Sequence, residues 1–432
     1  MEQALQSTVM RRALPAVALF VASLFTYSAV RLWIADHRIH VEKLESLESA
    51  VRLEPGNADA WDALGRFRQL DLNYADPAES LVAYQRAVEA NPHSATLRMN
   101  LAAAYEGEDD IAAARAQFAA AAAAYPLSAE VSWNYGNFLL RQGKTDEGYA
   151  QIRKAVLSDR SLLPLASSRV WRASRDINVL LDDVLPADAD SYSAALDYFS
   201  SIDQTAPSLA VWERLIGLSQ PMPLSKSFPL IDALVQTDDS ADAARVWVEA
   251  LKAAGMAYSQ PLNHSLIWNG NFLRDFENGG LDWRYDPVLG VTLDFDTVPP
   301  GHDGRSLRMD FGGGNNTELD SPLQYVPVEP NHAYHFRATM RTEDISTESG
   351  LRYLITDPNH ANAVNVTTEN LTGSNPWKPV TAEFTTGPDT HFLAIRLRRT
   401  ASRLFENRLS GTVWVCDAYL IPAELDAGQP PK

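Results

Sequence analysis

The stretches AYQRAVEANP (residues 83–92) and QFAAAAAAYP (residues 117–126) set the period of the first half of the chain. In each of them an aromatic residue stands three positions before an alanine, and a proline follows five positions after it. Ala87 recurs as Ala121, 34 residues later. Small alanines let two helices approach closely, aromatics fill the space beside them, and proline stops a helix. This spacing predicts stacked helical hairpins.

A helical repeat of this length with these residues resembles the tetratricopeptide (TPR) family. The match covers about residues 40–160, and three residues are inserted near Leu72–Pro77. The residues that carry it are Leu47, Ala50 and Pro55 in a half-repeat, Trp61, Leu64, Gly65 and Tyr84 in the first unit, Leu101, Ala102, Ala114 and Phe118 in the second, and Gly136, Leu139, Gly148, Ile152 and Ala155 in a degenerate third. The resemblance implies an α-helical superhelix over residues 37–160 with a concave surface for a protein partner.

In TPR proteins an asparagine one turn into the first helix of a unit commonly bonds the bound backbone. Asn100 and Asn134 match that position. The resemblance therefore implies a protein-partner groove, made by Arg66, Met99, Asn100, Trp133, Asn134, Asn137 and Arg141. The alternative is that these are solvated helix residues of a generic repeat.

Residues 161–258 have helical spacing but no clear period. We expect either further degenerate repeats or a helical cap that joins the array to the following domain. The predicted helices are Ala166–Leu181, Ala189–Ser201, Ser208–Leu218, Pro229–Val235 and Ala241–Ala254.

The N-terminal segment 1–36 predicts a single-pass anchor. No charged residue occurs from Ala13 to Val30, and Arg11 and Arg12 precede this stretch. Its length suits one transmembrane helix, and the arginines favour a cytoplasmic N-terminus with the bulk of the chain outside, in the periplasm of a cell with an inner (cytoplasmic) membrane. A cleaved signal, with a weak site at Tyr27-Ser28-Ala29, and a buried soluble helix are the alternatives.

Composition narrows the classes of function. A chain of 432 residues is too long for one hydrophobic core and predicts several domains. Its net charge of -18, with no basic stripe, argues against a nucleic-acid partner. The single cysteine, Cys416, excludes an internal disulfide, and we expect it to be buried in a strand.

From about residue 259 the alanine-rich helical pattern gives way to short segments that alternate apolar and polar residues, separated by Gly, Pro, Asn and Asp. Such segments are Leu307–Phe311, Tyr334–Arg341, Val380–Phe384 and Phe392–Leu397, and the apolar segment Val413–Cys416 is also expected to be a strand. They predict an all-β sandwich of jelly-roll type over residues 259–425, followed by a tail, residues 426–432. The complete prediction is a multidomain α and β protein.

This domain resembles non-catalytic carbohydrate-binding modules and related galactose-binding-like jelly rolls. The likeness is carried by Asn269-Gly270-Asn271-Phe272, Gly280-Leu281-Asp282-Trp283, Gly304-Arg305-Ser306-Leu307, Leu323-Gln324-Tyr325-Val326 with Val328–Asn331 and Tyr334, and the segment Ser410–Leu420. It implies that Trp283 and Trp414 are buried in the core.

Sugar binding needs aromatic faces with polar side chains beside them. The candidate carbohydrate-binding residues are Trp268, Tyr285, Arg352, Tyr353, Trp377 and Arg396. The alternative for each aromatic is packing in the core or at its rim.

The resemblance also makes calcium a candidate structural ion. Asp417 matches the aspartate that such modules carry in the last strand. Leu273 stands where the other acid is often found, so Asp275 or Glu277 would replace it.

No phosphate-binding loop, GxSxG, HExxH or Cys-His arrangement occurs, and we expect no catalytic residues. The expected function is that of a membrane-anchored extracytoplasmic scaffold, in which the groove recruits a protein and the sandwich contacts a glycan or a protein. Exopolysaccharide or cell-envelope assembly is the expected setting. The alternatives are a surface sugar-binding protein with a helical spacer, and a glycan-active enzyme.

Overall fold

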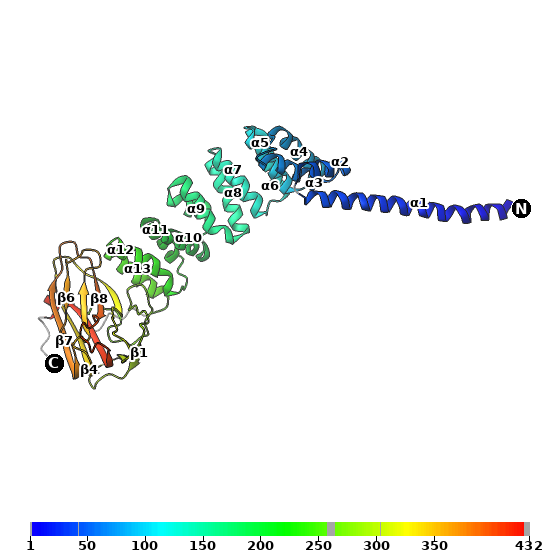
Figure 1. The fold of residues 1–432 in the computed structure, drawn as a ribbon. Helices are drawn as coiled ribbons and strands as arrows, with labels where there is room; N and C mark the ends of the chain where they lie inside the picture. The colour runs from blue at the N-terminus through cyan, green and yellow to red at the C-terminus, as the bar shows by residue number, and fades with distance from the viewer. Residues whose placement is uncertain (1, 42, 257–263, 303, 427–432) are drawn as a thin grey trace. The chain divides into compact units, whose positions relative to one another are not determined.

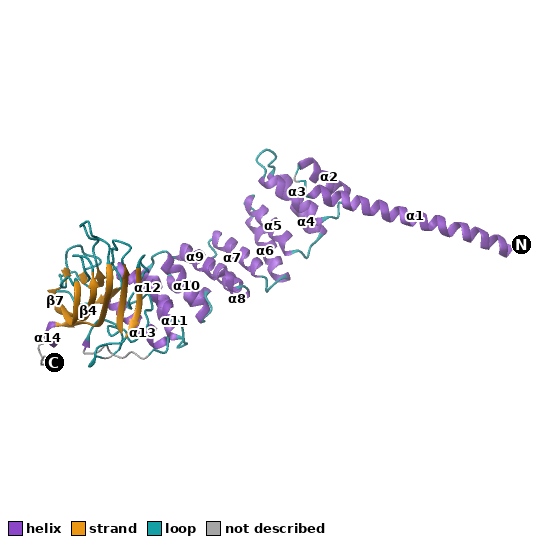
Figure 2. Ribbon diagram, turned by 60° about the horizontal axis from the view of Figure 1, so that its bottom comes forward, coloured by secondary structure: helices purple, strands orange, loops and turns teal. Residues whose placement is uncertain are grey.

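The computed structural model describes residues 2–41, 43–256, 264–302 and 304–426, with side chains from residue 15 onward. The chain divides into two compact units, Met1–Pro186 and Ala187–Lys432. The first is entirely helical in its described part, and the second combines helices with two β-sheets (Figures 1 and 2).

The first unit begins with α1, a helix of 38 residues from Glu2 to Ile39. Its section Pro15–Ile39 is long and apolar enough to cross a membrane, and large side chains such as Leu19 and Phe25 are exposed. This exposure argues against a buried core helix. The other end of α1 packs against α2 (Leu44–Leu53): Ala35 is fully buried, and the Arg38 guanidinium donates to the Ser49 hydroxyl.

The half-repeat predicted from the sequence is thus completed by the end of α1, which pairs with α2. The remaining helices of the repeats follow as antiparallel pairs, as predicted. They are α3 (Ala58–Leu70), α4 (Pro77–Ala90), α5 (Ala95–Gly107), α6 (Ile111–Ala124), α7 (Ala129–Arg141) and α8 (Thr145–Ser158). Side-chain caps start five of these six helices: Asn57, Asp76, Ser94, Asp110 and Ser128 each accept a backbone N–H three residues on.

Small residues make the contacts between paired helices. Ala87 and Ala121 have no exposed surface, and Phe118 packs beside Tyr135 and Phe138 at ring-centroid distances of 5.7 and 5.0 Å. Tyr135 replaces the leucine usual at its position in the degenerate unit. The aromatic ring therefore fills the same space by stacking on Phe118.

The predicted helix Ala166–Leu181 is wrong as one element. After the short η1 (Arg160–Leu162), α9 (Leu163–Ser174) ends at Arg175, and a π-helical turn η2 (Val179–Val184) closes the unit. Arg175 has φ 55°, in the left-handed region that terminates helices. The periodic apolar pattern continued across this stop, and the arginine gave no signal of it.

The second unit opens with helices near their predicted positions. These are α10 (Ala189–Ser201), α11 (Thr205–Gly217), the short η3 (Leu224–Ser227), α12 (Phe228–Gln236) and α13 (Ser240–Ala253). They belong with the sandwich. Arg284 forms an ion pair with Asp232 of α12, and the Asn359 amide donates to the Val235 carbonyl at 2.8 Å.

The β-domain consists of two antiparallel sheets, which confirms the predicted fold class. One sheet has the order β1-β2-β9-β4-β7 and the other β3-β8-β5-β6. The strands are β1 (Val291–Asp296), β2 (Ser306–Gly312), β3 (Leu323–Pro327), β4 (Ala333–Ile345), β5 (Arg352–Thr356), β6 (Asn365–Thr367), β7 (Gly373–Thr385), β8 (Phe392–Arg398) and β9 (Ser410–Pro422); α14 (Ala423–Asp426) follows. Alternate residues of both sheets fill the core between them.

Within that core Trp283 is 1% exposed, as predicted, and its indole N–H donates to the Asn269 carbonyl at 3.2 Å. Phe272 packs against it at a centroid distance of 5.6 Å. The two sequence motifs that suggested the module therefore meet in the core. Their role here is structural.

A substitution at Gly65 tests how closely α3 packs on α4. A Cβ at this position would lie 2.9 Å from the buried Tyr84 ring, whereas a Cβ on Gly107, at the end of α5, would meet nothing within 4 Å. We expect Gly65→Ala to lower the free energy of unfolding of the first unit by about 1–2 kcal/mol, because overpacking exceeds the gain in helix propensity. Gly107→Ala should leave it unchanged or raise it. Urea unfolding followed by circular dichroism measures both, and a stabilised Gly65→Ala variant would contradict the packing.

Candidate functional site

The first candidate site is the row of polar side chains on the first helices of the repeat hairpins. The Asn100 amide on α5 donates to Asp62 on α3 at 2.7 Å, and Arg66 lies 3.9 Å from the same aspartate. Farther along, Arg141 on α7 makes two bonds to the Glu106 carboxylate on α5, at 2.8 and 2.7 Å. We call these five residues the repeat row.

Three of the predicted groove residues thus lie in the repeat row, and sequence reasoning missed their partners Asp62 and Glu106. Asp62 precedes Arg66 by one helical turn, so its helix position could have signalled it. The negative charge of Asp62 also acts on Tyr84, whose pKa is raised to about 12 by burial first and by Asp62 second.

Other predicted groove residues are placed differently. Met99 is buried in the hydrophobic core with Phe118, so its assignment to the groove is corrected. Asn137 is also buried, and its amide donates to the Trp133 carbonyl of its own helix at 2.8 Å. Trp133 is half-buried and Asn134 is exposed, so both remain accessible.

A hollow of about 570 Å³ opens beside Arg66, where the end of α1 meets α2 and α3. Ile39, Phe67 and Leu70 give it apolar walls, and Leu70 is 69% exposed. The hollow combines apolar surface with the charge of Arg66. Such a combination is typical of surfaces that bind protein segments.

The second candidate site is the open face of the five-stranded sheet, around Trp414. Val413 and Val415 point into the core and are fully buried, so Trp414 between them points outward and is half-buried. The prediction that Trp414 lies in the core is therefore wrong. The alternation of inward and outward side chains along β9 indicates that Trp414 points outward. The prediction had followed the motif resemblance instead.

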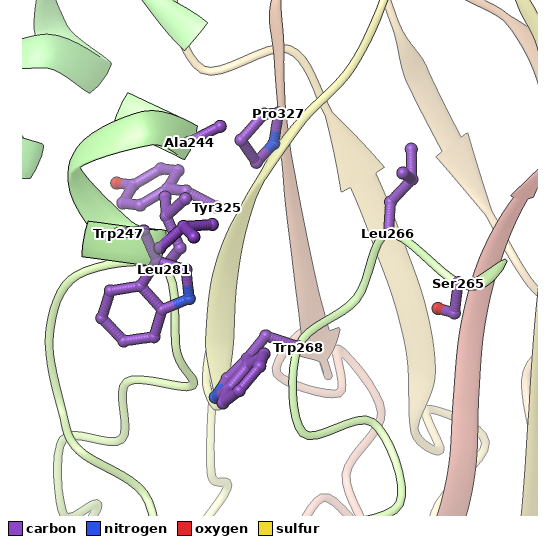
Figure 3. A pocket seen from close by; sticks show the side chains of 9 residues that line it. Ala244, Trp247, Ser265, Leu266, Trp268, Leu281, Tyr325 and Pro327 are labelled. Atoms are coloured by element: carbon purple, nitrogen blue, oxygen red, sulfur yellow. The ribbon is translucent and has the colours of Figure 1, made fainter. Parts of the chain in front are cut away.

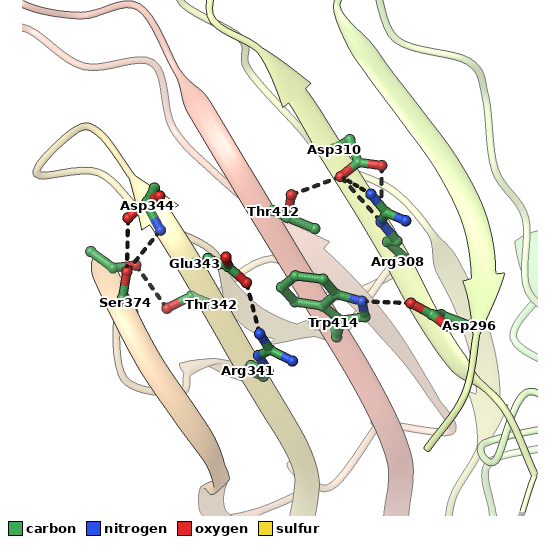
Figure 4. A network of polar contacts seen from close by, with 11 residues as sticks. Asp296, Arg308, Asp310, Arg341, Thr342, Glu343, Asp344, Ser374, Thr412 and Trp414 are labelled. Atoms are coloured by element: carbon green, nitrogen blue, oxygen red, sulfur yellow. Dashed lines mark hydrogen bonds and ion pairs between the residues drawn. The ribbon is translucent and has the colours of Figure 1, made fainter. Parts of the chain in front are cut away.

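Trp414 lies between two arginines, as Figure 4 shows. The guanidinium carbons of Arg341 and Arg308 are 4.4 and 5.9 Å from its ring centroid. Each arginine is paired with an acid on its own strand, Arg341 with Glu343 at 2.7 Å and Arg308 with Asp310 at 3.1 Å. We call these five residues the tryptophan face.

The indole N–H of Trp414 donates to Asp296 at 3.2 Å. The Thr297 N–H first, and this indole second, hold the pKa of Asp296 below its usual value. The face therefore offers carboxylates and guanidiniums side by side around one aromatic ring. Planar polar groups beside an aromatic ring suit hydroxyl-rich ligands.

The predicted carbohydrate-binding residues do not form one platform. Tyr353 is fully buried against Phe336, with ring centroids 4.7 Å apart, and this excludes it from contact with a sugar. Trp268 is 8% exposed and packs against Trp247 of α13.

The other four lie apart from one another. Tyr285 packs at the margin of the core, and Trp377 is half-buried on β7. Arg352 and Arg396 belong to the four-stranded sheet, where Arg352 donates to Asn370 and Arg396 to Asp320.

The predicted calcium ligands are also separate. Asp275 is exposed and pairs with Arg305 at 2.8 Å, and the backbone N–H of Glu277 donates to Asp282 at 3.0 Å. Asp417 instead hydrogen bonds with His302. Among the described residues these three acids do not come together as one group of metal ligands, so their grouping as a calcium site is corrected.

His302, Cys416 and Asp417 have ligand atoms within 4.8 Å of one another. Asp417 reaches this position because β9 has an irregularity there, with φ 52° at Asp417. Cys416 is fully buried, as predicted, and burial raises the pKa of its thiol to about 12. The thiol is therefore protonated near neutral pH and is a weak ligand.

No family model matches the chain, and no curated protein matches it. Solved structures similar to parts of the chain include MamA, with 13% identity over 40% of this chain and 85% of that chain and a TM-score of 0.26. PilF of Pseudomonas aeruginosa has 14% identity over 52% of this chain and 95% of that chain, with a TM-score of 0.29. A tetratricopeptide repeat protein from Parabacteroides merdae has 19% identity over 50% of this chain and 86% of that chain, with a TM-score of 0.26. These TM-scores are too low to assign a function to the chain.

Asp282 gives a pH-dependent prediction for the β-domain. Its carboxyl is 1% exposed, and burial raises its pKa from 3.8 to about 7. Between those two values the carboxyl ionises in the unfolded chain but stays protonated in the fold, so its contribution to stability is full at low pH and is lost as the pH rises to about 7. From pH 4 to 8 the wild type should lose roughly 4 kcal/mol relative to Asp282→Asn, at about 1.4 kcal/mol per pKa unit.

Hydrogen exchange of strands β2 and β9 in urea measures this difference. Asp286→Asn removes an exposed carboxylate four residues away and should follow the wild type at every pH. Parallel pH profiles for wild type and Asp282→Asn would contradict the raised pKa.

Proposed function

We propose that this protein is a non-catalytic, membrane-anchored scaffold. The observation that carries the proposal is the repeat row with the hollow beside Arg66: exposed charges and open apolar surface lie on the first helices of consecutive hairpins. In stacked helical hairpins this surface is available to an extended partner. The partner would be a protein segment with apolar side chains and charged groups of both signs.

The anchor part of the proposal rests on α1. Its apolar section has the length of a membrane span, and its end is packed on α2. An uncleaved helix would hold the hollow close to the membrane surface. Arg11 and Arg12 favour a cytoplasmic N-terminus, which puts the repeats and the sandwich outside the cytoplasm, in the periplasm.

A second binding function is favoured by the tryptophan face. Its arginines are already paired with carboxylates, so it carries little net charge to attract an anion. Hydroxyl groups can donate to those carboxylates and accept from the guanidiniums while a sugar ring lies beside Trp414. We therefore propose a neutral glycan as the ligand of the sandwich, in keeping with a role in exopolysaccharide or envelope assembly.

Site-specific cross-linking tests the protein-binding groove. A photo-crosslinking amino acid at Asn134, which is exposed on α7, should give a discrete adduct in cells of the native host. The same amino acid at Arg86, on the second helix of a hairpin, should not. Adding Arg66→Glu and Arg141→Glu should reduce the adduct at position 134 at least about tenfold, because the ionic contacts of the row are reversed.

Equal adducts at positions 134 and 86, or an adduct that survives both charge reversals, would refute the groove. Mass spectrometry of the adduct identifies the partner. Circular dichroism of each variant verifies that the helices are retained.

Glycan-array binding by the full chain in lipid nanodiscs tests the tryptophan face. Trp414→Ala and Arg341→Ala should each weaken binding about tenfold or more, in line with the loss of one stacking or hydrogen-bonding group. Arg398→Ala is the matched control, because Arg398 is paired with Glu318 at 2.7 Å on the other sheet. Binding that falls equally in all three variants, or no binding to any neutral glycan, would rule out this role.

A further inference from the structure

Two adjoining cavities lie where α13 packs against the sandwich within the second unit. The first has a volume of about 150 Å³ and the second about 430 Å³. Ala244, Leu266 and Pro327 line both, so the cavities are immediate neighbours. We call them together the junction groove, and Figure 3 shows its first cavity.

The first cavity has aromatic walls from three separate elements. Trp247 of α13 and Trp268 meet edge to face, with centroids 6.0 Å apart and planes at 88°. Tyr325 of β3 forms the third wall, and the Arg284 guanidinium lies 5.1 Å from its ring. Apart from Ser265, the remaining side chains that line the cavity are apolar. A cavity this small admits a single small side chain rather than a drug-sized molecule.

Trp247 contributes an unpaired hydrogen-bond donor. Its side chain is 4% exposed, and its indole nitrogen has no hydrogen-bond partner within the described residues. The six-membered ring packs onto Gly280, on the opposite side of the indole. Figure 3 shows the nitrogen on the side that faces Trp268 and β3. A buried N–H without a partner costs about 1–3 kcal/mol, which a ligand carbonyl in the cavity would recover.

The floor of the groove is an edge strand. β3 pairs only with β8 in its sheet, and Leu323 exchanges two backbone hydrogen bonds with Arg284 on the side away from β8, at 2.9 and 2.7 Å. Backbone groups alternate along an antiparallel strand, so the N–H and C=O of Tyr325 point to that same side. An extended peptide could pair with them.

The second cavity is acidic. Glu329 and Glu424 each approach the His332 ring nitrogen Nε2, at 3.5 and 3.6 Å, and their side chains are 75% and 69% exposed. No lysine or arginine occurs among the described residues that line this cavity. Two exposed carboxylates without a cationic partner of fixed charge favour a basic side chain in the ligand.

We propose that the junction groove binds an extended, proline-containing basic peptide. The proline ring occupies the aromatic cavity, and the carbonyl before it accepts from the Trp247 indole. The peptide backbone runs along β3 at Tyr325, and a lysine or arginine reaches Glu329 and Glu424. A glycan fits less well, because the apolar walls leave most of its hydroxyl groups without partners. The site shares no residue with the repeat row or the tryptophan face.

Fluorescence polarisation with labelled hexapeptides and the full chain in nanodiscs tests this proposal. The probes are hexapeptides that contain the run Pro-Pro-Lys-Lys, and the set places this run at each possible position in the hexapeptide. We expect at least one of them to bind, and its affinity to fall at least about tenfold when glutamates replace the lysines or when alanines replace the prolines.

Substitutions in the junction groove show whether the peptides bind there. Trp247→Phe keeps an aromatic ring and removes the N–H, and it should weaken binding about tenfold, the worth of one recovered hydrogen bond. Glu329→Gln combined with Glu424→Gln changes only exposed side chains and should weaken binding of the lysine peptides to the level of the alanine controls. Trp414→Phe, on the other sheet, should bind as the wild type does.

No binding by any proline-lysine register would overturn the proposal. Binding that is unchanged both in Trp247→Phe and in the double glutamine variant would overturn it as well. Because the glutamine changes are at exposed positions, the test holds even if Trp247→Phe is less stable.

Discussion

The close approach of paired helices at small residues is the constraint on which the first unit depends. Ala50, Ala87, Ala121 and Ala155 are each without exposed surface, one in each hairpin. A larger side chain at any of them would force the helices apart, and the aromatic residues beside them would lose their contacts. A hairpin does not bury its apolar surface alone, so the spacing at these alanines also determines how the next hairpin stacks.

In the second unit the comparable constraint is the filling of the space between two sheets. Trp283 and Phe272 pack together in that space, the Trp283 indole donates to the Asn269 carbonyl, and the Asn269 side chain accepts from the Arg274 N–H. The helices that precede the sandwich are attached to it by a few polar bonds and by the Trp247–Trp268 contact. The aromatic cavity is a product of this attachment, because neither the helices nor the sheets would form it alone.

The sequence predicted those helices and strands whose residue pattern is periodic within a single element. Alanines and prolines at a fixed spacing predicted the hairpins, and alternation predicted four of the nine strands in the described residues, since both patterns arise from the geometry of a single element. The predictions that were wrong rested on a resemblance to a family, and the contacts that were missed join residues far apart in the sequence. Trp414 was assigned to the core by its motif although Val413 and Val415 indicated the opposite. Met99 was assigned to the groove by repeat position although its helix turns it inward. The meeting of Trp247 with Trp268 depends on tertiary packing, for which one sequence contains no signal.

The junction between α1 and α2 has a mechanical consequence. Ala35 is packed without a gap, Arg38 is tied to Ser49, and the helix runs from Glu2 to Ile39 without interruption. In a bilayer, a helix responds to a change of thickness by tilting. Because the end of α1 is itself packed on α2, that tilt would be transmitted to the first hairpin as a rotation of the hollow beside Arg66. In the membrane-anchored scaffold proposed above, α1 would then act as a lever through which lipid composition alters how this surface is presented.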